Sequence, residues 1–175
     1  ALLSIISLIL YGFVYTPLKR VGPIAVFVGA IPGAMPPLLG WVAVQGEITS
    51  AALVLYGIQF IWQFPHFWAI AWIADEDYTK AGFKLLPSRG GKNINTALNI
   101  MTYTLFLIPI SLIPYVMNLT GSVSAIIVTI TGILFLVTAF RLMKNCDRKS
   151  ALFIMFGSFF YLPIVQIAYV LDKVQ

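Results

Sequence analysis

The sequence is poor in charged residues and has one cysteine and one histidine. Only 10% of its 175 residues are charged, whereas 60% are apolar. A soluble domain carries charge on roughly a quarter of its residues, so this composition excludes an ordinary soluble enzyme or binding module. The single Cys146 cannot form an internal disulfide. Low-complexity linkers and strand-like alternation are absent as well, which leaves one helical domain.

Long apolar runs take the place of the missing charge. The core of a bilayer is spanned by about 20 apolar residues in a helix. Five runs reach that length, and a shorter run occupies residues 1–15. The predicted fold is an all-α, polytopic transmembrane helical bundle with five full spans and a partial one. The full spans are predicted at about 23–44, 49–74, 95–117, 122–143 and 150–171.

The opening run, ALLSIISLILYGFVY, has neither an initial Met nor the basic segment of a signal peptide. We expect it to be part of a span that begins upstream. Residues 1–175 would then be one integral-membrane domain that lacks its N-terminal spans.

The basic residues predict how the chain lies in the membrane. Ten of the eleven Lys and Arg fall in alternate loops on one side, and Lys173 is the exception. The positive-inside rule assigns that side to the cytoplasm, or to the matrix of a mitochondrion. This topology accounts for the net charge of +5, so no nucleic-acid partner is expected. We expect a bacterial inner membrane, with the mitochondrial inner membrane as the alternative.

Half of the acidic residues stand together at the end of the predicted 49–74 span, as Asp75, Glu76 and Asp77. Adjacent carboxylates repel one another unless a cation binds them. Mg²⁺ prefers oxygen ligands and often joins one or two carboxylates to substrate phosphates. The sequence therefore predicts Mg²⁺ as cofactor, with Asp75 and Asp77 as its ligands. The alternative is that the acids are solvated or offset the lysines that follow.

A second cytoplasmic segment, YTPLKR, offers cations. Lys19 and Arg20 follow an apolar run, where basic residues commonly extend to the interface and Tyr15 would be an interfacial anchor. The functional alternative is that they hold an anion, since Arg suits bidentate contact with phosphate. Metal-binding acids in one loop and cations in another would suit a diphosphate substrate.

Polar residues also occur inside the predicted spans. Gln59, Gln63 and His66 share one helix face by their spacing, and polar groups inside a membrane usually face the bundle interior and mark function. His66 is predicted either to bind substrate or to be a hydrogen-bonded structural residue. Asn95 and Asn99 also share a face, and would reach a diphosphate or bond to neighbouring helices.

The segment GAIPGAMPPLLG is unusual within a span. Gly29 and Gly33 form a small-residue pair that lets helices approach closely. Three prolines remove backbone donors and bend the chain. We expect this segment to serve helix packing first and to line a cavity second.

Three segments in this order resemble the heme O synthase branch of the UbiA-type membrane prenyltransferases: YTPLKR, GAIPGAMPPLLGW and WQFPHFWAIAWIADEDYTKAGFKLLP. They lie between about residue 15 and residue 87. The resemblance implies a bundle of nine spans, with an active site that opens to the cytoplasm between two acid-rich loops. The first of those loops has no counterpart in this sequence, so the fragment alone is expected to be inactive.

The resemblance also implies a reaction. A farnesyl group would pass from farnesyl diphosphate to a vinyl group of protoheme IX (heme B), with Mg²⁺ assisting the departure of diphosphate, to give heme O. The expected partners are these two substrates and the lipid bilayer, with heme-handling or oxidase-assembly proteins as candidates. The alternatives are an aromatic quinone-precursor acceptor and a cation-coupled transporter subunit.

The resemblance assigns roles by position. Asp77 matches the second acid motif, whose acids are often four residues apart, but the position four residues on is Ala81. The number of carboxylates on the metal is therefore open. His66 matches a Pro-His motif and would ligate heme iron, orient the heme or bond a propionate. The predicted catalytic residues are Asp77, Asp75, Lys19 and Tyr15, and the predicted substrate-binding residues are Arg20, His66, Gln63, Gln59, Lys80, Asn95 and Asn99.

Overall fold

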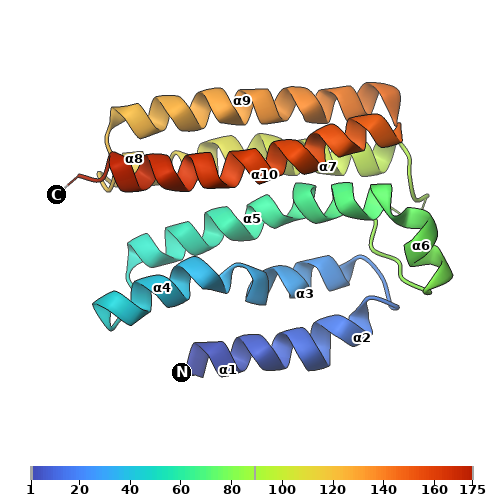
Figure 1. The fold of residues 1–175 in the computed structure, drawn as a ribbon, viewed down its shortest axis with the longest axis horizontal. Helices are drawn as coiled ribbons and strands as arrows, with labels where there is room; N and C mark the ends of the chain where they lie inside the picture. The colour runs from blue at the N-terminus through green and yellow to red at the C-terminus, as the bar shows by residue number, and fades with distance from the viewer. Residues whose placement is uncertain (1, 89, 175) are drawn as a thin grey trace.

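The computed structural model describes residues 2–88 and 90–174. Its elements in those ranges are helices, and long antiparallel helices lie side by side along one direction (Figure 1). Within the same ranges, an isolated bridge joins Thr120 and Lys173. In chain order the helices are α1 (Leu2–Ile9), the π-helical η1 (Leu10–Tyr15), α2 (Thr16–Leu18), α3 (Ile24–Gly33), α4 (Met35–Gln45), α5 (Ser50–Ile73), α6 (Asp75–Lys80), α7 (Ile94–Ser111), α8 (Ile113–Val116), α9 (Ser122–Asn145) and α10 (Arg148–Leu171).

The prediction of a polytopic membrane bundle is confirmed. Within the described ranges, four helical segments are long and apolar enough to cross a membrane, and they correspond to four of the five predicted spans. The opening run forms a shorter apolar helix, Leu2–Leu18. The chain is thus an integral membrane protein. The four segments are Ile24–Gln45, Ile94–Val116, Ser122–Asn145 and Arg148–Leu171.

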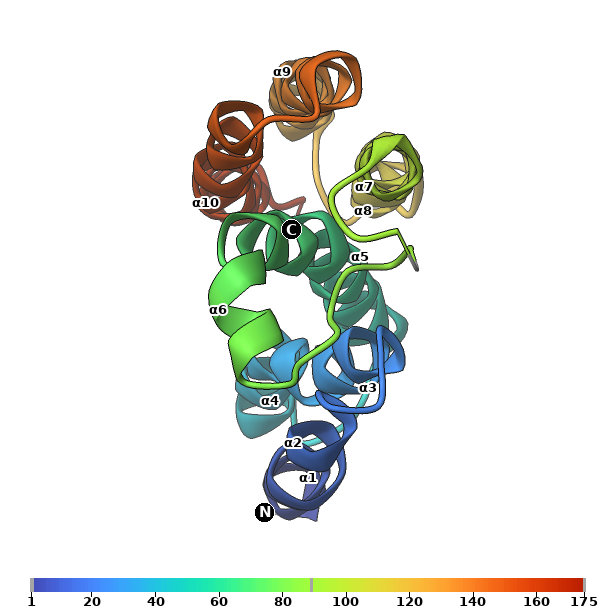
Figure 2. The ribbon, with the colours of Figure 1, turned by 90° about the vertical axis from the view of Figure 1, so that its right-hand side faces the viewer.

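The fifth predicted span, 49–74, is a helix of 24 residues, α5, but it is not among those four. Its position gives the reason. Helix α5 packs against α3 and α4 on one side and against α7 and α10 on the other (Figure 2). A helix in contact with so many others can carry polar side chains, because these find partners in protein rather than facing lipid.

The glycine pair packs helices as expected. A Cβ atom at Gly33 would overlap the side-chain amide of Gln63 on α5, and one at Gly29 would lie 2.6 Å from Tyr15 Cε2. The proline-rich chain turns between α3 and α4 at Ala34, directly after Pro32 and Gly33. The two small residues therefore set how closely α3 approaches α5 and η1.

The polar loops gather at one end of the bundle. The α2–α3 turn, helix α6, the chain that leads to α7 and the α9–α10 turn all lie there (Figures 1 and 2). Each Lys and Arg that the structure describes belongs to this end, except Lys173, which follows α10 at the opposite end. The chain thus presents one strongly charged end and one weakly charged end.

Candidate functional site

The acid cluster forms the first turn of α6, directly after α5. Helix α5 ends at Ile73, and the N–H of Ala74 bonds to the carbonyl of Ile70. Asp75, Glu76 and Asp77 then open α6. Acidic side chains in a first turn interact favourably with the helix dipole, so this placement benefits the fold even without a ligand.

Lysines lie close to the three carboxylates. Lys92 Nζ is 3.6 Å from Asp75 Oδ2 and 3.9 Å from Glu76 Oε1, and Lys80 Nζ is 3.9 Å from Asp77 Oδ1. The Asp77 side chain is 83% exposed and that of Asp75 is 30% exposed. Exposed pairs of this kind contribute only about 0–1 kcal/mol. The carboxylate of Asp77 is therefore easily released to an incoming cation.

A cavity of about 470 Å³ opens beside these acids, between α6 and the α9–α10 turn. Both signs of charge line it, as a metal-bound diphosphate would require. The alternation of basic loops placed the α9–α10 turn on the same side as the acids, but no sequence pattern indicated which of its residues lines this cavity, so sequence reasoning missed Arg148. The lining residues are Trp72, Ile73, Glu76, Asp77, Lys92, Cys146 and Arg148.

The donor set limits how a magnesium ion would bind. Asp75 and Asp77 are two residues apart on one helix, so their side chains do not face the same way. Among the residues described, no group of three or more His, Cys, Asp or Glu is arranged to hold a metal. Of the acids that line the cavity, Asp77 is the one that would hold a Mg²⁺, because this metal commonly takes one or two carboxylates and keeps several waters. Asp75 is held by Lys92.

The YTPLKR segment reaches the same end of the bundle. Lys19 Nζ lies 4.5 Å from the centre of the Tyr15 ring and 5.9 Å from that of Phe83, within the range of cation–π attraction. The N–H of Lys84 bonds to the carbonyl of Lys19 at 3.0 Å. The segment is thus joined to the chain that follows α6. Arg20 is exposed.

The glutamines inside α5 are hydrogen-bonded to neighbouring helices. The amide of Gln63 donates to the carbonyls of Ala30 at 3.1 Å and Gln59 at 3.4 Å, and Gln63 is only 2% exposed. Gln59 donates to the carbonyl of Gly33 at 3.2 Å and accepts from Gln166 at 3.1 Å. These bonds join α5 to α3 and α10 and leave Gln63 without an accessible group for a substrate.

His66 is bonded within the bundle. Its Nδ1 lies 2.7 Å from Ser158 Oγ, and that hydroxyl donates its one hydrogen to the carbonyl of Met155 at 2.6 Å. Nδ1 therefore carries the hydrogen and donates to Ser158. The imidazole stacks on Trp62, whose indole N–H bonds to the Ser158 carbonyl at 3.0 Å. This geometry supports the structural role for His66, because it joins α5 to α10.

Asn95 and Asn99 lie on the first turns of α7. The side-chain amide of Asn99 donates to the carbonyl of Asn95 at 2.8 Å. Neither side chain lines the cavity beside Glu76 and Asp77, which we term the acid-lined cavity. Their placement therefore favours local hydrogen bonding over contact with a diphosphate.

Comparison with known proteins places these features in context. The family model described as the UbiA prenyltransferase family matches residues 1–162. A Cytophaga hutchinsonii protein named protoheme IX farnesyltransferase is 58% identical over 99% of this chain and 60% of its own length. Proteins of the same name from Flavobacterium psychrophilum and Christiangramia forsetii are 48% and 47% identical, over 99% of this chain and 59% of their length. The chain thus spans about 60% of these curated relatives. No solved structure matches it.

Proposed function

The chain belongs to the UbiA prenyltransferase family, and from that premise we propose that the whole protein transfers a farnesyl group from farnesyl diphosphate to a vinyl group of protoheme IX. The observation that carries the proposal is the 58% identity to a protein named protoheme IX farnesyltransferase, over 173 residues. The acid-lined cavity supports it, because a diphosphate needs a metal ligand and cations on the same face.

In the proposed reaction the C1–O bond of farnesyl diphosphate breaks, and diphosphate leaves with the bonding electrons. The vinyl group forms a bond to C1. Water then adds to the resulting cation and loses a proton, which gives a hydroxyethylfarnesyl substituent. The largest electrostatic demand is the negative charge that develops on the leaving oxygens, so fixed positive groups near them would lower the barrier.

Several residues at the charged end would stabilise the negative charge of the leaving diphosphate. Asp77 would hold a Mg²⁺, which when bound neutralises diphosphate oxygens and assists their departure. Lys92 and Arg148, on the wall of the same cavity, would contact the remaining oxygens. Lys19 would approach from the second segment, with Tyr15 under its ammonium group. Lys80, 3.9 Å from Asp77 Oδ1, would move from the carboxylate to the diphosphate.

We propose that the charged end faces the cytoplasm of a bacterium and that the bundle lies in its inner membrane. The concentration of described Lys and Arg at that end supports this orientation. Partners that deliver protoheme or accept heme O belong to the same proposal, because both compounds are poorly soluble in water.

The test is a prenyl-transfer assay on membranes that contain the full-length protein. We expect protoheme, farnesyl diphosphate and Mg²⁺ together to yield heme O, detected by mass spectrometry, and chelation of Mg²⁺ to abolish it. Absence of heme O, with prenylation of an aromatic quinone precursor in the same membranes, would overturn the proposed acceptor. Absence of any prenylated product would overturn the proposed reaction.

A further inference from the structure

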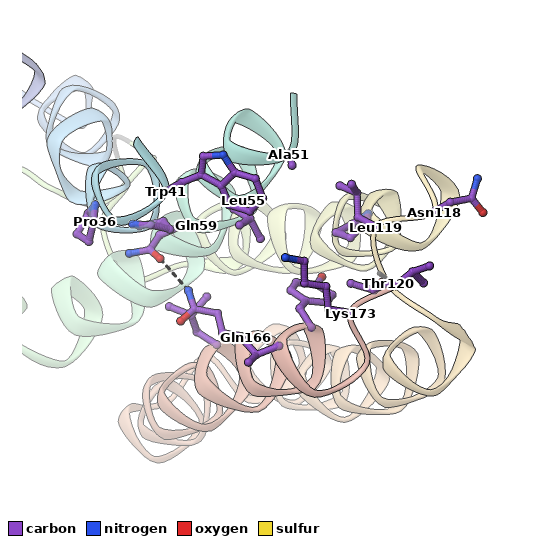
Figure 3. Close-up of a pocket in the computed structure, with 16 residues that line it drawn as sticks. Pro36, Trp41, Ala51, Leu55, Gln59, Asn118, Leu119, Thr120, Gln166 and Lys173 are labelled. Atoms are coloured by element: carbon purple, nitrogen blue, oxygen red, sulfur yellow. Dashed lines mark hydrogen bonds between the residues drawn. The ribbon is translucent and has the colours of Figure 1, made fainter. Parts of the chain in front are cut away.

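Cavities open at both ends of the described bundle, and they differ in charge. The groove of about 510 Å³ at the weakly charged end lies between α4, α5 and α10 (Figure 3), and its described lining holds Lys173 but no carboxylate. The acid-lined cavity holds Glu76 and Asp77 together with Lys92 and Arg148. A cation beside carboxylates can fold against them and be lost to a substrate, so its position determines whether it can serve a diphosphate.

The ammonium group of Lys92 is held by two carboxylates outside the metal position proposed for Asp77. Its Nζ lies 3.6 Å from Asp75 Oδ2 and 3.9 Å from Glu76 Oε1. The Asp75 side chain is 30% exposed, whereas that of Glu76 is 85% exposed. Because partly buried charge pairs are screened less by salt than exposed ones, Asp75 contributes more than Glu76 to the position of the ammonium group.

Asp75 and Lys92 stand in different relations to the cavity. Lys92 lines it, together with Asp77, whereas Asp75 is not one of the lining residues. A carboxylate outside the wall that pairs with a cation in the wall acts on the cavity through that cation. This arrangement suits a residue that orients Lys92 better than one that meets a metal-bound diphosphate directly.

The backbone that carries Asp75 is fixed by the end of α5. Asp75 directly follows Ala74, whose N–H bonds to the carbonyl of Ile70 at 2.9 Å. The carbonyl of Ala74 in turn accepts the N–H of Tyr78 at 2.9 Å. The position of Asp75 is therefore set by a long helix that packs against other helices on two sides.

The backbone that carries Lys92 is fixed to the first turn of α7. The carbonyl of Gly91 accepts the hydroxyl hydrogen of Thr96 at 2.6 Å, and Asn93 Oδ1 accepts the N–H of Thr96 at 3.0 Å. Thr96 is fully buried. Gly91 has a φ of 68°, a left-handed conformation that glycine adopts without strain. Both neighbours of Lys92 in the chain are thus bonded to α7.

We infer that Asp75 is a positioning residue, which orients Lys92 toward the diphosphate and does not bind the metal itself. This inference rests on the proposed function and deepens it, because it names the device that orients one of the cations on the leaving group. An ammonium group has three N–H donors, so Lys92 can keep one on Asp75 and direct another to a diphosphate oxygen. A cation that is oriented before the substrate arrives loses less entropy on binding.

Loss of the carboxylate distinguishes this role from a purely electrostatic one by the sign of the effect. If Asp75 acted only through its charge, Asp75→Asn would tighten the binding of an anion, because a nearby negative charge is removed. A positioning role predicts weaker binding, because Lys92 is no longer held. A metal-binding role also predicts weaker binding, but the loss would then depend on Mg²⁺ and not on Lys92.

The test measures the affinity of the full-length protein in nanodiscs for inorganic diphosphate with Mg²⁺, by titration calorimetry. We expect Asp75→Asn to weaken binding about threefold to fivefold and Lys92→Gln to weaken it at least about tenfold. Adding Asp75→Asn to Lys92→Gln should cause no further loss. Asp75→Glu should keep most of the affinity. Glu76→Gln, which removes the same charge from the more exposed neighbour, should not weaken binding.

The Mg²⁺ concentration that gives half-maximal diphosphate binding provides a second readout. It should be unchanged in Asp75→Asn and raised in Asp77→Asn. A raised requirement in Asp75→Asn would make Asp75 a metal ligand and overturn the inference. Unchanged or tighter diphosphate binding in Asp75→Asn would also overturn it, as would an equal loss in the Lys92→Gln background.

The wild-type protein separates this inference from the proposed function. If the wild-type protein binds no diphosphate, the proposed function fails and the inference fails with it. If the wild-type protein binds diphosphate and the Asp75 variants depart from the expected pattern, the inference alone fails.

Discussion

Polar side chains in the middle of α5 are buried and hydrogen-bonded, whereas Asp77 in α6, the short helix that follows, is exposed. In the middle, Gln63 and His66 are 2% and 6% exposed, and each is hydrogen-bonded to another helix or to its own. In α6, Asp77 is 83% exposed and its nearest cation is 3.9 Å away. The first group holds helices together, whereas the second is free to exchange its partners. Polar residues in one continuous segment thus serve two tasks.

The largest effect is expected at α6. Asp77→Asn in the full-length protein should lower heme O formation at least about 100-fold, because an amide would not replace the carboxylate on the proposed Mg²⁺. Thermal stability should change little, since the side chain is exposed. Glu47→Gln, an exposed acid at the opposite end, is the matched control. Normal turnover in the Asn variant would remove Asp77 from the metal site and weaken the comparison.

Added atoms where α3 packs against the middle of α5 should destabilise the protein. Gly33→Ala places a methyl group on the Gln63 amide, and we expect it to lower the free energy of unfolding by about 1–3 kcal/mol. Adding Gln63→Ala should recover part of the loss, which a double-mutant cycle would measure. Gly40→Ala, with open space around its Cβ position, is the control. Additive effects would show that the two residues do not interact.

Substitution of His66 distinguishes a role in helix packing from a role in substrate binding. His66→Ala should lower the free energy of unfolding by about 1–3 kcal/mol, because it leaves Ser158 and Trp62 without their partner. Heme titration of the folded variant should be unchanged. A reduced heme affinity with unchanged stability would instead place His66 in the substrate site, as its motif suggested. Ser158→Ala should reproduce the stability loss.

The smallest effect is expected at the start of α10, outside the spans. Hydrogen bonds from the side chain and then the backbone N–H of Ser150 hold the pKa of Asp147 below its usual value of 3.8. Since the folded state has the lower pKa, the carboxylate stabilises the fold at neutral pH, and this contribution is lost as the pH falls below 3.8 through the folded value. Asp147→Asn should therefore lower the melting temperature slightly at neutral pH.

That small difference should shrink as the medium is acidified. Melting curves recorded at decreasing pH would check this, with Glu47→Gln, an exposed acid at the opposite end of the bundle, as the control. A difference that stays constant across the acid range would show that the charge on Asp147 plays no part.

Hydrophobic run length was sufficient to predict most of the fold. Four of the five predicted spans are confirmed, because the length of an apolar helix is dictated by the bilayer it crosses. The alternation of basic loops predicted which segments share an end, and the structure gathers the acid cluster and the YTPLKR segment there. The i, i+4, i+7 spacing correctly indicated that Gln59, Gln63 and His66 point to the bundle interior.

Only the tertiary structure decided what these residues contact. The spacing within α5 says which side chains share a face, but Ala30 and Ser158 are 33 and 92 residues away from their partners in the chain. Arg148 likewise lines the cavity beside Asp77, although the two residues lie far apart in the chain. Local patterns specify each helix because its backbone bonds are local, whereas hydrogen-bond partners and cavities depend on how the helices pack.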